Sequence, residues 1–176
     1  MTIKSSVIAL LFCASIPSLG HAETPWRFEP LGVECVFPTH WVLEQAAEHG
    51  DLAKGGVLVR ADRTPGLPAG VRFELSLEPL AIQRTAPAEA LEVLLKNLKE
   101  TPKLQVLGSE KSKIRDNVSE VRVTWKIAQS RHTLESVYRI LDMKDRRLVA
   151  SISGRVELVA GVRDELSQLW DSIRAE

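Results

Sequence analysis

The side chains that could bind a metal ion are few and far apart in the sequence. Beyond residue 22 the histidines are His40, His49 and His132, and none of them belongs to a His-x-x-x-His pair. Zinc and calcium sites need several His, Cys or acidic ligands at short spacing. His49 lies two residues before Asp51, but a polar turn ahead of the following glycines explains both residues more simply. The sequence therefore predicts no metal site.

Acid–base catalysis is the second kind of chemistry that the sequence could support, because distant carboxylates and histidines can meet in a folded protein. The candidates are Glu74, Glu78, His132 and Asp142. Glu74 and Glu78 alternate with apolar residues in one expected strand, which favours a solvated polar face. The chain has no Gly-x-Ser-x-Gly, Ser-x-x-Lys or dinucleotide-binding motif. We therefore expect no enzyme and no cofactor, with a hydrolase-type enzyme built from these four residues as the alternative.

Cys35 is the cysteine that remains if residues 1–22 are removed, because Cys13 lies within them. A single cysteine forms no intrachain disulfide, so packing must stabilise the chain. Cys35 alternates with Val33 and Phe37, and the three side chains therefore face the same side of an expected strand. We predict a buried, chemically inert thiol, with a redox or metal-binding thiol as the alternative.

The balance of charges argues against a nucleic-acid partner. Lys and Arg together number 23, as do Asp and Glu, so the formal net charge is zero. Proteins that bind polyanions normally carry a strong positive excess. A small basic cluster, Lys144, Arg146 and Arg147, falls at an expected hairpin tip. We interpret this cluster as solvent-exposed charge that aids solubility, with a binding role as the alternative.

Residues 1–22 have the three zones of a secretory signal peptide. A basic residue precedes an apolar stretch over 7–16, and small residues at Gly20 and Ala22 come before Glu23. This pattern predicts cleavage between Ala22 and Glu23, with cleavage after Gly20 as the alternative. The apolar stretch is much shorter than the about 20 residues of a transmembrane helix. We therefore expect an exported protein, periplasmic or secreted, with no stable membrane anchor.

Sheet patterns dominate residues 23–176. Over 71–78 apolar and polar residues alternate perfectly, which predicts a strand with one buried face. The connections at 143–146 and 116–117 are too short for a parallel crossover, so the strands beside them form antiparallel hairpins. The expected strands are 33–37, 41–47, 57–62, 71–78, 104–114, one that begins at Val118, 133–142 and 147–154.

Two segments change to the helical period. Over 88–99 four leucines form one stripe, and Thr101-Pro102 ends the helix. Over 158–173 apolar residues line one face of a second helix. No repeat or break in composition divides residues 23–176. We therefore expect a single α+β domain over 23–176, with a central antiparallel sheet flanked by helices.

The longest irregular stretch between two expected strands is 62–70. A plain hairpin needs about two to five residues there, so the extra length calls for an explanation. Pro65 and Pro68 restrict the backbone, while Leu67 and Arg63 offer an apolar and a charged contact. We expect this candidate binding loop to contact an unknown envelope protein or a small ligand, with a tolerated insertion as the alternative.

Two short motifs lie near the ends of this series of elements. Phe-Pro-Thr-His-Trp at 37–41 follows the first expected strand, and Asp-Ser-Ile at 171–173 ends the last helix. The motifs and the order of the elements, over most of 28–174, resemble the PsbP-like fold that the bacterial DcrB-like envelope proteins share. Members of that family often carry Gly before the Trp, where this chain has His40, a residue that adopts a left-handed backbone less readily than Gly.

This resemblance implies a PsbP-like α/β/α sandwich, in which helices flank a central antiparallel sheet of about seven strands. It also implies an accessory, assembly or binding role, and it supplies no catalytic residues. Together with the signal-peptide pattern, it leads us to expect an exported, soluble, non-catalytic accessory or binding protein of the cell envelope.

The signal-peptide interpretation predicts the mass of the mature protein. Cleavage after Ala22 leaves a chain that begins at Glu23, and intact-mass spectrometry of the exported protein should find that mass. A retained Met1, or the mass of a diacylated Cys13, would contradict the interpretation.

Overall fold

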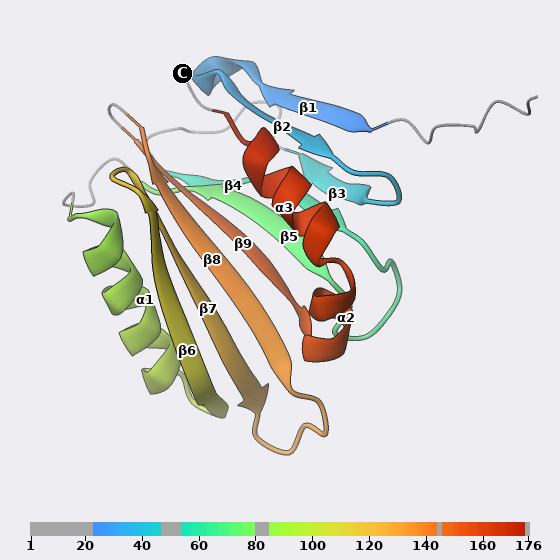
Figure 1. Ribbon diagram of the computed structural model, residues 1–176, viewed down its shortest axis with the longest axis vertical. Helices are drawn as coiled ribbons and strands as arrows, with labels where there is room; N and C mark the ends of the chain where they lie inside the picture. The colour runs from blue at the N-terminus through green and yellow to red at the C-terminus, as the bar shows by residue number, and fades with distance from the viewer. Residues whose placement is uncertain (1–22, 47–53, 80–84, 144–145, 175–176) are drawn as a thin grey trace, which may run out of the picture.

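A seven-stranded antiparallel sheet forms the centre of the protein (Figure 1). The computed structural model describes residues 23–46, 54–79, 85–143 and 146–174. Within these residues the sheet order is β3-β4-β5-β9-β8-β7-β6, and every neighbouring pair is antiparallel. This architecture confirms the α+β fold class that the sequence predicts.

The strands of this sheet are β3 (Val42–Ala46), β4 (Gly56–Asp62), β5 (Arg72–Leu77), β6 (Leu104–Arg115), β7 (Val118–Ile127), β8 (Leu134–Asp142) and β9 (Arg147–Arg155). A separate two-stranded sheet pairs β1 (Thr24–Phe28) with β2 (Val33–Phe37), joined by the short helix η1 (Glu29–Leu31). The helices are α1 (Pro87–Glu100), α2 (Val156–Gly161) and α3 (Arg163–Ser172). None of the helices in the described ranges is long and apolar enough to cross a membrane.

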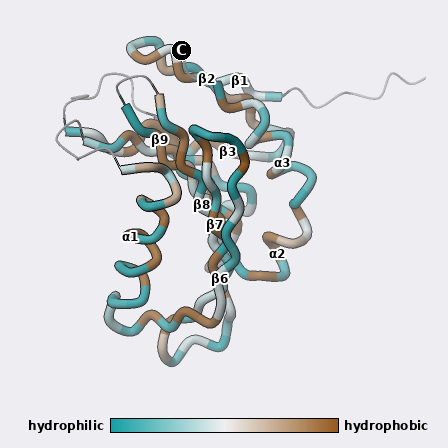
Figure 2. The backbone as a smooth tube through the Cα atoms, turned by 60° about the vertical axis from the view of Figure 1, so that its left-hand side comes forward, coloured by the Kyte–Doolittle hydropathy of each residue, from teal (hydrophilic) through white to brown (hydrophobic). Residues whose placement is uncertain are grey.

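The two faces of the sheet are covered by different layers (Figure 2). On one face α1 packs over β6, β7 and β8. On the other face lie α2, α3 and the β1–β2 hairpin, and this side contains the larger core. The alternation of β5 explains the division, because Phe73, Leu75 and Leu77 point into the larger core while Glu74 and Ser76 point to the α1 side. The layers match the sandwich that the resemblance implies.

The β1–β2 hairpin is a feature that the sequence analysis did not predict. In β1 only Trp26 and Phe28 are buried, and their rings stack with centroids 6.4 Å apart. Two apolar positions are too few for a recognisable alternation. Pairing with β1 also places β2 outside the main sheet, which its own pattern does not reveal.

The prediction of one continuous helix over 158–173 is wrong. The chain forms α2 and α3 with a break at Val162, whose φ of −119° and ψ of 20° are not helical. Gly161, just before the break, lowers the helical propensity. The break turns α3 so that Leu166, Leu169 and Trp170 are buried against the sheet and the hairpin.

Both motifs behind the resemblance have a structural role. His40 adopts a φ of 75°, so it takes a left-handed conformation that Gly adopts more readily than other residues. In the second motif, the Val36 backbone N–H donates to Ser172 Oγ at 2.9 Å, and Ser172 Oγ donates to the Leu169 carbonyl at 2.8 Å. Ser172 therefore ties the last turn of α3 to β2.

Cys35 lies in the larger core with 1% of its surface exposed, as predicted, and burial raises the pKa of its thiol to about 12. The reactive thiolate is thus scarce at neutral pH. The folded protein should react with a maleimide far more slowly than the urea-denatured protein, which mass spectrometry of timed samples can measure. Equal rates in the two states would place the thiol at the surface.

Candidate functional site

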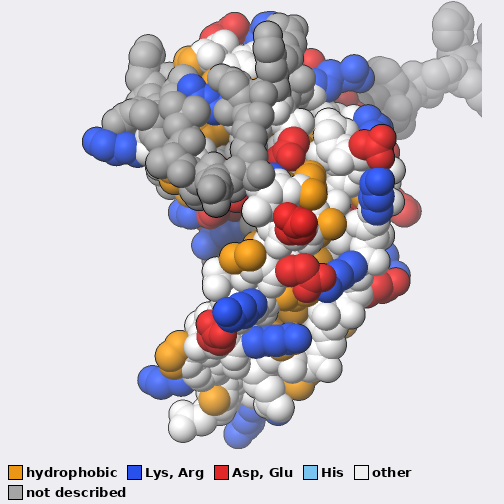
Figure 3. All heavy atoms as spheres, turned by 90° about the vertical axis from the view of Figure 1, so that its left-hand side faces the viewer, with side chains coloured by type: hydrophobic (Ala, Val, Ile, Leu, Met, Phe, Trp, Pro, Cys, Tyr) orange, Lys and Arg blue, Asp and Glu red, His pale blue; other side chains and the backbone are white. Residues whose placement is uncertain are grey.

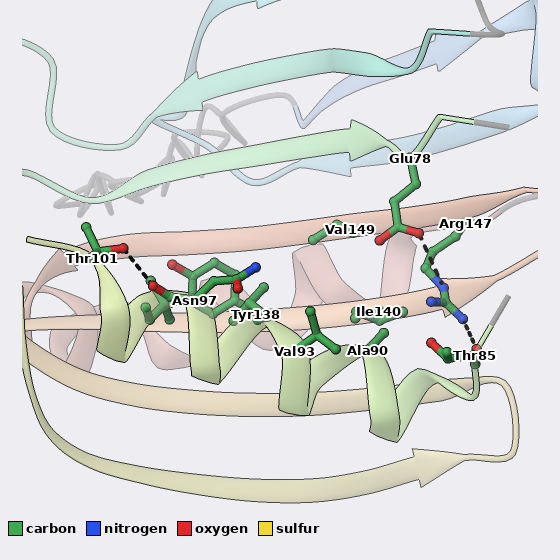
Figure 4. A pocket seen from close by; sticks show the side chains of 12 residues that line it. Glu78, Thr85, Ala90, Val93, Asn97, Thr101, Tyr138, Ile140, Arg147 and Val149 are labelled. Carbon is green, nitrogen blue, oxygen red and sulfur yellow. Dashed lines mark hydrogen bonds and ion pairs between the residues drawn. The ribbon is translucent and has the colours of Figure 1, made fainter. Parts of the chain in front are cut away.

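A cleft of about 630 Å³ lies between α1 and the sheet. Its walls are mainly apolar and come from α1 on one side and from β8 and β9 on the other. Figure 4 shows this arrangement, with polar groups gathered at the two ends. The side chains along its length are Ala90, Val93, Leu94, Tyr138, Ile140 and Val149.

The packing of α1 explains why the cleft exists. Leu91 and Leu95 are buried against β7 and β8 and hold the helix to the sheet. Ala90, Leu94 and Asn97 lie on the neighbouring face of the helix, where Ala90 and Leu94 are only partly buried and line the cleft. A narrow contact row on one side of α1 therefore leaves an apolar gap on the other.

One end of the cleft is built around the guanidinium group of Arg147. The β8–β9 register pairs Asp142 with Arg147, and their side chains form two hydrogen bonds, Nε to Oδ1 at 2.6 Å and Nη2 to Oδ2 at 3.1 Å. Arg147 also donates to the Thr85 carbonyl, and its Nε lies 3.8 Å from Glu78 Oε2. The Arg147 side chain is 5% exposed, so three separate segments satisfy a buried charge.

The surroundings shift the proton affinities of these groups. The hydrogen bond to Asp142 raises the pKa of Arg147 further above its ordinary value. Burial raises the pKa of Glu78, and the negative charge of Asp142 adds to this effect while Arg147 opposes it. Burial also raises the pKa of Tyr138, which lines the cleft. Arg147 therefore stays charged, and the ionised form of Glu78 is only partly stabilised.

The opposite end of the cleft is polar but uncharged. The Thr101 hydroxyl donates to the Asn97 carbonyl at 2.7 Å, and Tyr138 lies close to both in Figure 4. Such groups can accept or donate single hydrogen bonds to a bound molecule. The cleft thus combines an apolar middle with one charged and one neutral polar end.

The fold brings together only part of the predicted acid–base set. Glu78 lines the cleft and Asp142 binds Arg147 at its end. Glu74 instead accepts a hydrogen bond from Arg60 Nε at 3.0 Å, and His132 lies exposed in the β7–β8 connection. The interpretation of Glu74 and Glu78 as solvated carboxylates is wrong, because both are partly buried and paired with arginines.

The interpretation of Arg147 as a solvent-exposed charge at a hairpin tip is also wrong, because it is the most buried charge of the cleft. Its place opposite Asp142 across a four-residue connection is the sequence signal that could have revealed the pair. Lys144 lies outside the described residues, as do His49, Asp51 and the predicted cleavage site at Ala22. Within the described ranges no three His, Cys, Asp or Glu side chains lie close enough to hold a metal ion.

The candidate binding loop at 62–70 is firmly attached to the fold. Arg63 forms two hydrogen bonds with Glu165 of α3, at 2.7 and 3.0 Å, and these hold the pKa of Glu165 below its ordinary value. The Ala69 carbonyl accepts a hydrogen bond from the Arg155 N–H. Leu67 is 41% exposed, and the prolines on either side of it are exposed too. A contact between this loop and a partner stays a prediction.

The outer face of α1 provides no comparable site. Val93 borders the cleft and is 55% exposed, but Figure 3 shows hydrophobic side chains scattered among charged ones on this side of the molecule. Interaction surfaces for proteins usually present a continuous apolar patch. The cleft is therefore the stronger candidate on this side of the sheet.

The structure predicts that Asp142 stabilises the fold through Arg147. Asp142→Asn removes the charge that binds a buried guanidinium, and we expect the free energy of unfolding to fall by about 1.5–3 kcal/mol in urea titrations. Asp116→Asn is the matched control, because the ion pair of Asp116 with Lys113 is exposed and should not affect the urea midpoint. Equal midpoints for the two variants would contradict a stabilising role for Asp142.

Comparisons with known proteins show similarity at the level of the fold. No protein-family model matches the chain, and no curated protein matches it. The solution structure of cyanobacterial PsbP (CyanoP) from Synechocystis sp. PCC 6803 aligns with a TM-score of 0.58 and 10% identity, over 93% of this chain and 99% of that one. LpqN of Mycobacterium tuberculosis, described as involved in cell envelope biogenesis, gives 0.53 and 14%, over 88% and 90%. The Ran-binding protein Mog1p of Saccharomyces cerevisiae gives 0.56 and 11%, over 88% and 95%. The chain therefore shares the fold of PsbP and Mog1p.

Proposed function

We propose that the mature chain is an exported, non-catalytic accessory protein of the cell envelope that binds a small, largely apolar ligand in the cleft beneath α1. The observation that carries this proposal is the cleft itself, whose volume of about 630 Å³ lies well within the range of ligand sites. An apolar middle with a few fixed polar groups is the usual composition of such sites.

The binding energy would come from the removal of apolar surface from water. Each Å² of apolar surface that a ligand buries contributes about 25 cal/mol before the costs of association. Ile140 and Val149 project from neighbouring strands, so the floor of the cleft is held in place by the sheet. A preformed floor lowers the ordering cost of binding.

The arrangement of the carboxylates supports a non-catalytic role. A general acid and base must both reach the reacting atoms. Asp142 uses both of its oxygens on Arg147, and Glu74 is bound by Arg60, so Glu78 is the carboxylate left to face the cleft. The hydrolase alternative needs a second group beside Glu78, and none of the other three candidates takes that place.

The export part of the proposal rests on the signal-peptide pattern of residues 1–22 and on the predicted cleavage between Ala22 and Glu23. One protein of the same fold, LpqN, is described as involved in cell envelope biogenesis, and another, Mog1p, as Ran-binding. These descriptions support an accessory binding role. They also agree with a protein partner at the 62–70 loop as an additional contact.

The cleft predicts binding of a neutral, apolar fluorophore. Nile red should bind the mature protein with a rise in fluorescence, and Ala90→Phe should weaken this binding about tenfold or more because the ring occupies the cleft. Ala88→Phe is the matched control, because Ala88 is exposed on the same helix and should leave the affinity unchanged.

Thermal unfolding of both variants checks that neither has lost its fold. Equal Nile red affinities of the Ala90→Phe variant and the unmodified protein would place the dye elsewhere and contradict a ligand site in the cleft. Absence of Nile red binding to the unmodified protein would do so directly.

A further inference from the structure

Among the described residues that line the cleft, Glu78 and Arg147 are the charged ones, and the ion pair between them is long. Arg147 directs its two short ionic hydrogen bonds, at 2.6 and 3.1 Å, to Asp142 and a further one to the Thr85 carbonyl. Its contact with Glu78 measures 3.8 Å, which exceeds hydrogen-bond distance. The guanidinium group is committed to Asp142, and Glu78 is left with a long contact.

The carboxylate of Glu78 is therefore short of positive charge. Burial and the nearby Asp142 raise its pKa even though Arg147 acts in the opposite direction, so the guanidinium does not make up for the lost hydration. Within the part of the chain that the structure describes, the carboxylates of Glu78 and Asp142 and the guanidinium of Arg147 sum to a charge of −1. A cation beside Glu78 would supply the missing counter-charge.

The apolar walls of the rest of the cleft determine what kind of molecule could carry such a cation. From Glu78 the space continues past Val149 and Ile140 on the sheet and past Ala90 and Val93 on α1, as Figure 4 shows. The cleft follows α1 from Ala90 to Leu98, which is about 12 Å at the helical rise per residue. A molecule with its cation at Glu78 must therefore place an apolar chain along the helix.

We infer that the cleft binds a single-chain amphiphile whose primary ammonium group contacts Glu78 and whose apolar chain lies along α1. This inference rests on the proposed function and names the class of its ligand. A primary ammonium carries several N–H donors, and such charge-assisted hydrogen bonds to a carboxylate are the strong ones. A carboxylate-headed amphiphile would be repelled by Glu78 and Asp142, whose two negative charges exceed the single positive charge of Arg147. Arg147 also directs three of its five N–H groups to Asp142 and Thr85.

Displacement of Nile red by three probes of equal chain length tests the inference. Decylamine is cationic at pH 7, decanol is neutral and decanoate is anionic, so their common chain isolates the effect of the head group. We expect decylamine to displace Nile red from the mature protein at concentrations about tenfold or more below those of decanol, with decanoate the weakest.

Glu78→Gln separates the head-group contact from the apolar contacts. In this variant decylamine and decanol should displace Nile red at about equal concentrations, with the affinity for Nile red measured on the variant itself. Thermal unfolding checks that the variant is folded. Glu89→Gln is the matched control, because Glu89 is an exposed carboxylate in the first turn of α1 that does not line the cleft. The control should keep the preference.

The outcomes distinguish this inference from the proposed function. Nile red binding with equal displacement by all three probes, or with decanoate the strongest, overturns the ammonium inference and leaves an apolar ligand site in place. A preference for decylamine that survives in the Glu78→Gln variant overturns it as well. Failure of Nile red to bind the unmodified protein overturns both.

Discussion

The guanidinium group of Arg147 connects three segments that are far apart in the sequence, and the geometry of the cleft depends on this connection. Asp142 fixes the register of the β8–β9 hairpin through it, Glu78 follows the last residue of β5, and Thr85 lies just before α1. A buried guanidinium that lost one of these partners would carry a large desolvation penalty. The hydrogen bonds of this one buried charge therefore hold the segment just before α1 next to the first residue of β9.

The cleft follows from how little of α1 touches the sheet. Leu91 and Leu95 are its fully buried leucines, and each contributes about 1.5–3 kcal/mol by burial. The adjacent row that contains Ala90 is only partly buried and lines the cleft together with Val149 and Ile140. One face of α1 thus stabilises the packing on this side of the sheet, and the neighbouring face of the same helix lines the cleft.

Local patterns were sufficient to predict most of the elements and insufficient for the site. Alternation, turn residues and helical period together predicted the seven main strands and α1, because each of these signals belongs to one element or one turn. The break at Val162 escaped prediction because the apolar period continues through it, and only packing against the sheet decides it. The β8–β9 hairpin was predicted, and its register places Asp142 opposite Arg147. The burial of Asp142 and Arg147 also depends on Glu78 and on the segment before α1. These residues are distant in the sequence, so no local pattern predicts that they lie beside Arg147.

The opposite face of the sheet is held by contacts that do not involve α1. Glu165 of α3 accepts hydrogen bonds from Trp41 and Arg63, and Phe73 packs edge to face against Trp170. These contacts fasten α3 to the turn after β2 and to the loop between β4 and β5. Side chains on the two faces alternate along each strand, so in the described part of the chain α1 and α3 pack against opposite faces of the sheet. A ligand beneath α1 can therefore alter the packing of that helix while the α3 layer keeps the sheet in place.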